Sequence, residues 1–246
     1  ENHSKIINGK GGKMGYQISN DVLVKYKEEA GITEVVIPEG VTSIGDEAFE
    51  YCKNLTSIII PQSVTSIGKY AFSSCNSLTH ILIPEGVTDI GDSAFRSCER
   101  LISINFPEGV IHIPKGAFQY CGNLTDIDIP KSVTKIGDEA FYGCKDLTNI
   151  VIPESVSSIG DEAFFGCESL TRLVIPKNVR NIGDGAFARC KSLTSLVIPD
   201  HITSIPNSAF QWCESLTNLV IPKNVTNIGD GAFAGCKSLT SFVIPE

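Results

Sequence analysis

Apolar and polar residues follow one another along most of the chain in a pattern that repeats every 23 residues. Ten of the twelve prolines, all nine cysteines and nine of the twelve phenylalanines keep this step without an insertion or a deletion. One unit, from Ile60 to Leu82, reads IPQSVTSIGKYAFSSCNSLTHIL. Repetition with a period of about 20 to 50 residues is typical of solenoids and related repeat folds. The chain is therefore expected to fold as a stack of similar coils.

Each unit predicts a strand, a polar turn and one short helical turn. In the segment L-x-x-I-x-I, Ile58 and Ile60 lie on one side of a strand, and Pro61 ends it. The later stretch D/K-x-A-F-x-x-C would bring Phe49 and Cys52 to one face of a helical turn. The aspartates at its start are expected to act as N-caps. They are Asp46, Asp92, Asp138, Asp161, Asp184 and Asp230.

No unit can bury its apolar side alone, so stacking must supply the core. The expected fold is an α/β solenoid with one parallel strand per unit, the sheet on the concave face and the helical turns on the convex side. Proline replaces glycine at Pro114 and Pro206, in the column that begins with Gly45. Because proline requires a negative φ, close packing between coils rather than a left-handed backbone must favour glycine there.

The consensus I-P-x-x-V-x-x-I-G-x-x-A-F-x-x-C-x-x-L-x-x-I resembles the BspA-type (treponemal-type) leucine-rich repeat, and the similarity extends over residues 32–246. The resemblance implies a right-handed leucine-rich-repeat superhelix. It also implies an extracellular or cell-surface protein, from a family of surface and secreted proteins associated with adhesion to host proteins.

The repeat divides the chain into three parts. Residues 1–15 carry four glycines and no apolar pattern, and are expected to be a flexible N-terminal segment. Residues 16–31 include YQISNDVLVKY, which predicts a hairpin cap with its turn at Asn20-Asp21. Residues 32–246 form the solenoid. Since the sequence stops at SFVIPE, partway into another unit, we expect further repeats or a domain beyond it.

Composition excludes several classes of function. With 42% hydrophobic residues the chain is too apolar for general disorder, and its net charge of −8 argues against nucleic-acid or anionic-membrane partners. It contains no apolar run long enough to span a bilayer. The four histidines are scattered, no catalytic or metal motif occurs, and we predict neither an enzyme nor a cofactor. The cysteines share one repeat position and are interpreted as buried packing residues.

The candidate binding surface is the predicted concave sheet. The third and fifth residues of each strand should face solvent there, and the fifth is apolar in eight of ten strands. Asn105 and Asp128 interrupt this apolar column. We expect partner contacts from His80, Asn105, Asp126, Asp128, Asn149, Arg172, Val151, Val174, Val197 and Val220. The alternative is that valine in this column simply suits a pleated strand.

Other readings of polar and aromatic residues carry less weight. Asp126 and Asp128 could form a glycosidase pair or a divalent-cation site, but an open sheet gives no walled cleft for either chemistry. The threonines at the strand entrances are expected to bond to backbone. Exposed aromatics could bind glycans, although they occupy several columns and do not form one row. They are Tyr51, Tyr70, Tyr120, Tyr142, Phe165 and Trp212.

The sequence thus favours a non-enzymatic protein-binding module that adheres to an extracellular host or matrix protein. A structural spacer or self-assembly unit, and a glycan-binding module, remain alternatives. The partner, the anchoring device and the oligomeric state do not follow from the sequence.

Overall fold

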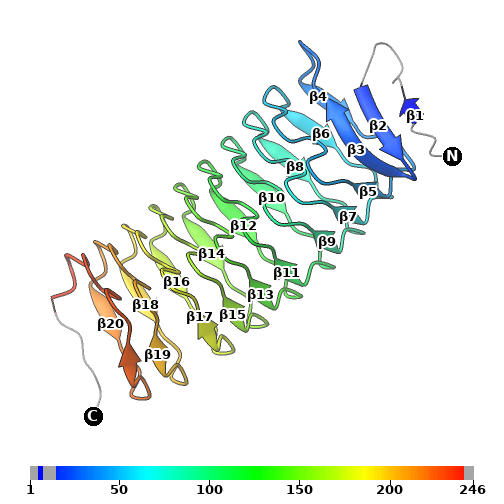
Figure 1. Ribbon diagram of the computed structural model, residues 1–246. Helices are drawn as coiled ribbons and strands as arrows, with labels where there is room; N and C mark the ends of the chain where they lie inside the picture. Colours follow the sequence, from blue (N-terminus) through cyan, green and yellow to red (C-terminus); the bar gives the residue numbers. More distant parts are fainter. Residues whose placement is uncertain (1–4, 8–14, 241–246) are drawn as a thin grey trace.

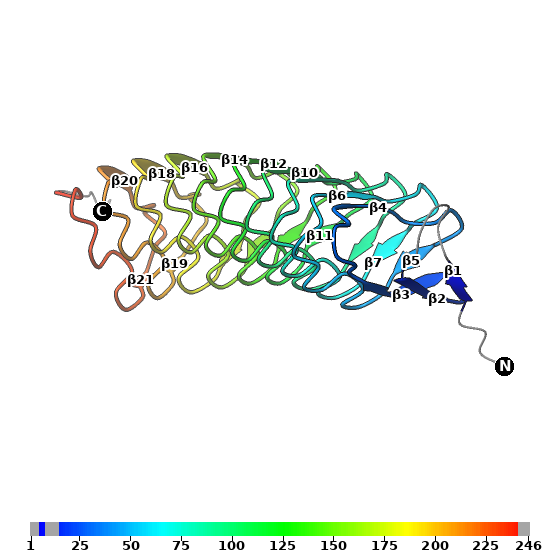
Figure 2. The ribbon, with the colours of Figure 1, turned by 90° about the horizontal axis from the view of Figure 1, so that it is seen from above.

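The computed structural model describes residues 5–7 and 15–240, and in it the chain winds into stacked coils (Figure 1). Each coil takes one 23-residue unit, and the first and last coils lie at opposite tips of an elongated rod (Figures 1 and 2). A coil has three sides: a longer strand, a shorter strand and a run of turns. The prediction of a solenoid is confirmed.

The first side, which we call the long-strand face, is a ladder of three-residue strands. The strands are β4 (Glu34–Val36), β6 (Ser57–Ile59), β8 (His80–Leu82), β10 (Ser103–Asn105), β12 (Asp126–Asp128), β14 (Asn149–Val151), β16 (Arg172–Val174), β18 (Ser195–Val197) and β20 (Asn218–Val220). Paired neighbours are parallel and join residues one repeat apart, such as Ile104 with Ile127. The tenth predicted strand falls largely on residues 241–246, outside the described part.

The second side is a ladder of two-residue strands, so the expectation of one strand per unit is wrong. The strands are β5 (Ser43–Ile44), β7 (Ser66–Ile67), β9 (Asp89–Ile90), β11 (His112–Ile113), β13 (Lys135–Ile136), β15 (Ser158–Ile159), β17 (Asn181–Ile182), β19 (Ser204–Ile205) and β21 (Asn227–Ile228). A strand of two residues is too short to show the period-two alternation by which strands are detected in a sequence.

Proline explains the breaks in this second ladder. Strand β9 does not pair with β11, and β17 does not pair with β19. In the other coils, the glycine after the short strand donates its N–H to the preceding coil, as Gly137 does to the Ile113 carbonyl at 2.8 Å. Pro114 and Pro206 occupy this place after β11 and β19 and have no N–H. The ladder stops where that donor is missing.

The third side, which we call the turn face, contains no helix in any of the described coils, so the predicted helical turns are wrong. Two residues of every coil have a positive φ, at the positions of Glu47 (55°) and Tyr51 (63°). Twelve of these eighteen residues are not glycine. Left-handed residues at such short intervals prevent a right-handed helix.

Hydrogen bonds between coils take the place of helical ones. The N–H groups of Glu47, Phe49 and Tyr51 donate to carbonyl groups of the next coil at 2.8, 2.7 and 2.9 Å. A helix would direct them back along the same coil. Because the described coils contain no helix, the reason for expecting a concave sheet opposite bulky helices is absent. The stacked coils form an elongated rod (Figure 2).

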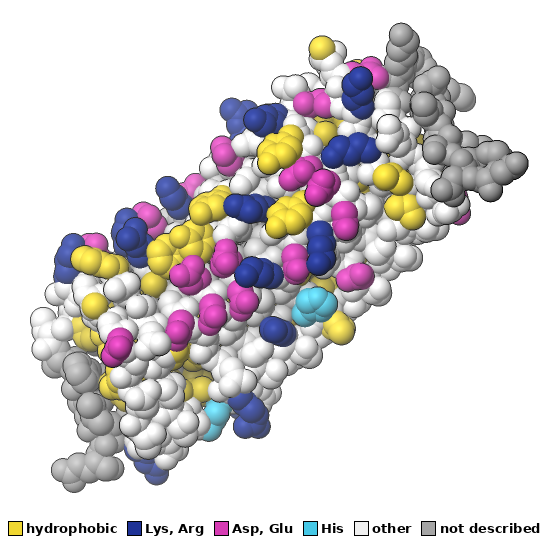
Figure 3. Space-filling model, viewed as in Figure 1, with side chains coloured by type: hydrophobic (Ala, Val, Ile, Leu, Met, Phe, Trp, Pro, Cys, Tyr) yellow, Lys and Arg dark blue, Asp and Glu magenta, His cyan; other side chains and the backbone are white. Residues whose placement is uncertain are grey.

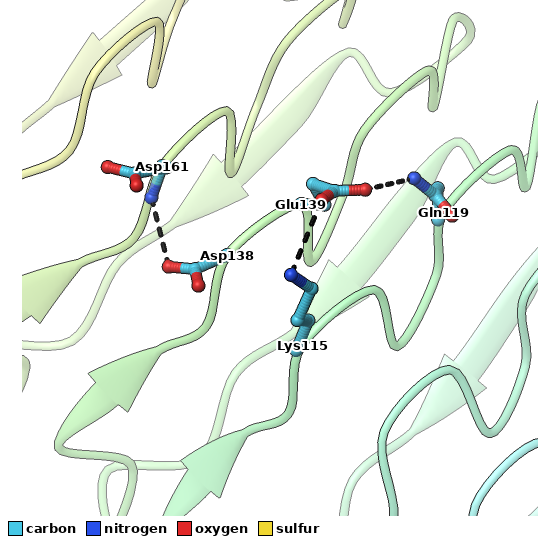
Figure 4. A network of polar contacts seen from close by, with 5 residues as sticks. All are labelled: Lys115, Gln119, Asp138, Glu139 and Asp161. Atoms are coloured by element: carbon cyan, nitrogen blue, oxygen red, sulfur yellow. Dashed lines mark hydrogen bonds and ion pairs between the residues drawn. The ribbon is translucent and has the colours of Figure 1, made fainter.

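The aspartates at the start of the turns also join coils instead of capping helices. The N–H of Asp184 donates to Asp161 Oδ1 at 2.9 Å, and the N–H of Asp161 donates to Asp138 Oδ1 at 3.1 Å (Figure 4). A Cβ added at Gly160 would lie 2.5 Å from the Asp138 nitrogen, although the φ of Gly160 is not positive. Close packing therefore favours glycine in this column, which confirms the prediction.

The core consists of identical side chains stacked along the rod. Phenylalanine rings from Phe49 to Phe233 stack with centroids 5.2–5.6 Å apart. Eight of the nine cysteines are buried and free, as predicted, and Cys236 is half-buried. Each thiol from Cys75 onward also donates to a phenylalanine carbonyl of the preceding coil, as Cys75 does to Phe49 at 3.2 Å.

An antiparallel arm continues the second ladder at the N-terminal end. Strands β1 (Lys5–Ile7), β2 (Gly15–Ser19) and β3 (Val22–Lys27) form it, and β3 pairs in parallel with β5. Strand β1 and the first residue of β2 lie within residues 1–15, the segment expected to be flexible, while residues 1–4 and 8–14 lie outside the described part. Tyr26 stacks on Phe49 with centroids 5.2 Å apart and so continues the aromatic stack.

Replacing Gly160 with Ala should destabilise the protein by about 1–3 kcal/mol, because the added Cβ overlaps the backbone of the preceding coil. Gly122 is the matched control, since a Cβ there meets nothing within 4 Å. Urea unfolding monitored by circular dichroism should separate the two variants. Equal midpoints for Gly160→Ala and Gly122→Ala would contradict the close-packing explanation.

The core thiols should be almost unreactive in the folded protein. Burial raises the pKa of Cys52 and of Cys190 to about 12, which lowers the thiolate fraction at pH 8 about a thousandfold. Titration with a thiol-specific disulfide reagent should modify Cys236 first and the other eight only after urea is added. Rapid modification of several thiols in the folded protein would contradict this.

Candidate functional site

The long-strand face presents the predicted third and fifth columns to solvent. In the long strands from β4 to β18, the central residue is buried, and the residues on either side of it are exposed or half-buried. Among the apolar members of the fifth column, Leu82 is 76% exposed, Val151 79% and Val174 63%. Val197 and Val220 continue the row and are also exposed. The predicted orientation of these columns is confirmed, while their role in binding stays a prediction.

Strand register brings most of the predicted polar residues together. Asp126 lies between Ser103 and Asn149 in the third column. Asp128 lies between Asn105 and Val151 in the fifth column. His80 begins β8 one strand beyond Ser103, and its Nδ1 lies 3.1 Å from Thr79 Oγ1.

Asn105 forms hydrogen bonds within the protein through both polar atoms of its side chain. Its Nδ2 donates to the Ile83 carbonyl at 3.0 Å, and its Oδ1 accepts the Ile83 N–H at 3.0 Å. The side chain is half-buried between the two coils. Both polar atoms of the amide thus serve the coil stack. The break in the apolar row at this position has a structural cause, which the sequence pattern could not reveal.

Arg172 and the valines beyond it are separated from Asn149 by an opening in the ladder. Strands β14 and β16 belong to different sheets. Next to the ladder, the Thr194 N–H donates to the Thr171 carbonyl at 3.0 Å, and the Thr148 N–H donates to the Thr125 carbonyl at 3.2 Å. Between these two pairs, in the described coils, the Thr171 N–H makes no such bond to the Thr148 carbonyl. The same two coils stay bonded on the second ladder, where β15 pairs with β17. The opening is therefore local to the long-strand face.

A groove of about 850 Å³ lies at this opening. Its lining includes Asp128, Lys131, Asn149, Val151, Glu154, Arg172 and Val174. Five of the fourteen lining residues are among those predicted from the columns, namely Asp128, Asn149, Val151, Arg172 and Val174. Lys131 and Glu154 were not predicted, because they lie in the loops that follow the strands and no repeated column marks them.

Threonine hydroxyls bond across the coils next to this face, as predicted. The Oγ1 of Thr148 donates to the Thr125 carbonyl at 3.2 Å, and that of Thr194 to Thr171 at 3.1 Å. These side chains are structural.

The turn face carries the other concentration of charge. Figure 3 shows acidic side chains in rows along the rod. Lys115 Nζ lies 3.6 Å from Glu139 Oε1, and Gln119 donates to the same carboxylate (Figure 4). Burial, followed by the charges of Glu139 and Asp161, raises the pKa of Glu162. Because the aspartates of this row accept backbone N–H groups, we interpret the row as part of the coil stack.

Three aromatics of the turn face, the exposed Tyr120 and the half-buried Tyr142 and Phe165, align more than the sequence predicted. Tyr142 and Phe165 stack with centroids 4.6 Å apart and planes 7° apart, and Tyr120 lies edge-on to Tyr142. The Arg189 guanidinium lies 5.5 Å from the Phe165 centroid. Since a sugar needs an uncovered ring face on which to stack, this arrangement gives little support to glycan binding.

Two features are absent from the described part of the chain: a metal-binding cluster and a helix suited to crossing a membrane. No group of three or more His, Cys, Asp or Glu side chains there could hold a metal ion. The described residues also include no helix with the length and apolar character needed to cross a bilayer.

Replacing Asn105 with Val should lower the free energy of unfolding by about 1–3 kcal/mol, because the two hydrogen bonds to Ile83 are lost. Asp128→Val is the matched control, since it changes an exposed residue in the same column of the next strand. Denaturant titration of both variants tests this. A structural role for Asn105 is refuted if the two variants unfold at the same urea concentration.

Several solved structures are similar to this chain. The pneumococcal vaccine antigen PcpA has a similar fold, with a TM-score of 0.59 and 22% identity over 89% of this chain and 65% of PcpA. A leucine rich cell surface protein from Faecalibacterium prausnitzii A2-165 is 27% identical over 97% of this chain and 89% of its own, with a TM-score of 0.46. The T. pallidum Leucine Rich Repeat protein is 25% identical over 96% of this chain and 92% of its own, with a TM-score of 0.49. The search of curated proteins found no match.

The sequence itself matches the BspA type Leucine rich repeat region in six copies, over residues 25–148 and 134–246. The match takes in every coil of the rod. The chain therefore belongs to the BspA-type leucine-rich repeat family.

Proposed function

We propose that this chain is a non-enzymatic protein-binding module of a surface or secreted protein, and that it adheres to an extracellular host or matrix protein through the long-strand face. Membership of the family supports a protein-interaction role in general. The observation that carries the proposal is the exposed row from Val151 to Val220, which begins at the groove between β14 and β16.

The choice of valine in this row supports binding over simple strand preference. Threonine is also β-branched and suits a strand equally well. The chain uses threonine at the strand entrance in nine of ten units. There the side chain meets solvent, and its hydroxyl forms a hydrogen bond to the preceding coil, as in Thr148 and Thr194. If strand propensity were the only requirement, threonine would serve in the fifth column too. Burial of each exposed valine against a partner would contribute up to about 1.5 kcal/mol.

A spacer or self-assembly unit is the second candidate, because the chain forms an elongated rod (Figure 1). Light scattering after size-exclusion chromatography distinguishes it. This candidate is favoured if the protein binds no extracellular protein and its measured mass increases with concentration.

The double variant Val151→Lys/Val174→Lys should weaken binding to extracellular proteins at least tenfold, because it places two charges in the apolar row beside the groove. Biolayer interferometry against a panel of purified matrix and serum proteins gives the measurement. Both residues are more than half exposed, so the melting temperature should stay nearly unchanged.

Ile111→Lys provides the control, since Ile111 is 58% exposed but lies beside β11, away from the long-strand face. It should bind the panel like the wild type. Equal binding by the double variant and the wild type would remove the long-strand face as the binding surface.

A further inference from the structure

We propose that the long-strand face binds an amphipathic α-helix of the partner, which lies along the rod with its N-terminal, basic end over Asp126 and Asp128. The inference rests on the proposed function and specifies its partner. It follows from the spacing of the exposed valines, from the groove between β14 and β16, and from the charges at one end of the row.

The spacing of the row matches a helix better than an extended strand. Val174, Val197 and Val220 follow Val151 in the same column, one per coil. With neighbouring strands about 4.8 Å apart, three steps from Val151 to Val220 span about 14 Å. Three turns of a helix advance about 16 Å. Three steps between same-side residues of an extended peptide advance about 20 Å.

The mismatch over the whole row is thus about 2 Å for a helix and about 6 Å for an extended peptide. A helix can keep one apolar residue over every valine, whereas an extended peptide falls out of step after the second.

The groove provides a place for the largest apolar side chain of such a helix. It lies between Val151 and Val174, at the start of the row, and has a volume of about 850 Å³. A Leu or Phe from the first apolar turn would enter it. The remaining turns would lie over Val197 and Val220.

Charge favours one direction for the helix. Asp126 and Asp128 are exposed on β12, directly before the valine row, and neither forms an ion pair with another described residue. Two carboxylates at this end favour Lys or Arg on the partner. They also favour the N-terminal end of a helix, where the backbone carries partial positive charge.

Selection from two displayed peptide libraries tests the inference directly. In one library, apolar residues recur at helical spacing (i, i+4, i+7, i+11) on a helix-forming background; in the other, they alternate as in a strand. Both vary in charge at their ends. Each is selected on the whole chain and counter-selected on Val151→Lys/Val174→Lys. We expect binders from the helical library alone, with Lys or Arg enriched near the N-terminus and at least tenfold weaker binding to the double variant.

Reversing the charges provides an internal check. On Asp126→Lys/Asp128→Lys, the selected helical peptides should lose at least tenfold in affinity, and a new selection should enrich Asp or Glu at the same end. Any of three outcomes would overturn the proposal. The alternating library alone could yield binders, or neither library could yield any. In the third, the charge reversal would leave the enrichment of Lys or Arg at the N-terminal end unchanged.

Failure of this inference can be told apart from failure of the proposed function. If the matrix and serum panel still binds through Val151 and Val174 while the helical library yields nothing, the face binds protein by another mode. If the panel also fails to distinguish the double variant from the wild type, the proposed function itself is wrong.

Discussion

The structure depends on hydrogen bonds that each coil makes with its neighbour on all three sides. A strand of two or three residues and a run of left-handed turns cannot satisfy their own backbone groups. Here, backbone N–H groups donate hydrogen bonds to the adjacent coil on every side. Gly137 does so on the second ladder, Glu47 on the turn face and Thr194 beside the long-strand face. An insertion in one unit would put these donors out of register on every side at once. This constraint explains a repeat that keeps 23 residues without exception.

The same constraint separates what the sequence could predict from what it could not. The coil period, the buried columns and the exposed valines recur at fixed positions, so pattern alone reveals them. The backbone of the turn face does not: Glu47 and Tyr51 have left-handed φ angles that neither residue type suggests. An A-F-x-x-C segment therefore looks helical. The site shows the same limit, because the column position of Asn105 is visible in the sequence and its bonds to Ile83 are not.

Departures from the repeat are informative because the rest is so regular. Pro114 and Pro206 remove a donor and interrupt the second ladder. The long-strand face is also interrupted twice, between β6 and β8 and between β14 and β16, where neighbouring strands belong to different sheets. The coils remain stacked at the interruptions of either ladder, since the row of stacked phenylalanine rings continues past them. The coils can therefore open on one side while the other sides hold them together.

The side chains that join the coils and the side chains of the proposed binding row are different sets. On the turn face, Asp138 and Asp161 bond to the next coil, and inside the rod the cysteines bond to the preceding one. The exposed valines of the fifth column take no part in any of these bonds. Their burial would release water from apolar surface without breaking a contact that the rod needs. Binding on the long-strand face is thus compatible with a rigid rod, and a rigid row of apolar residues favours a partner with a matching rigid repeat.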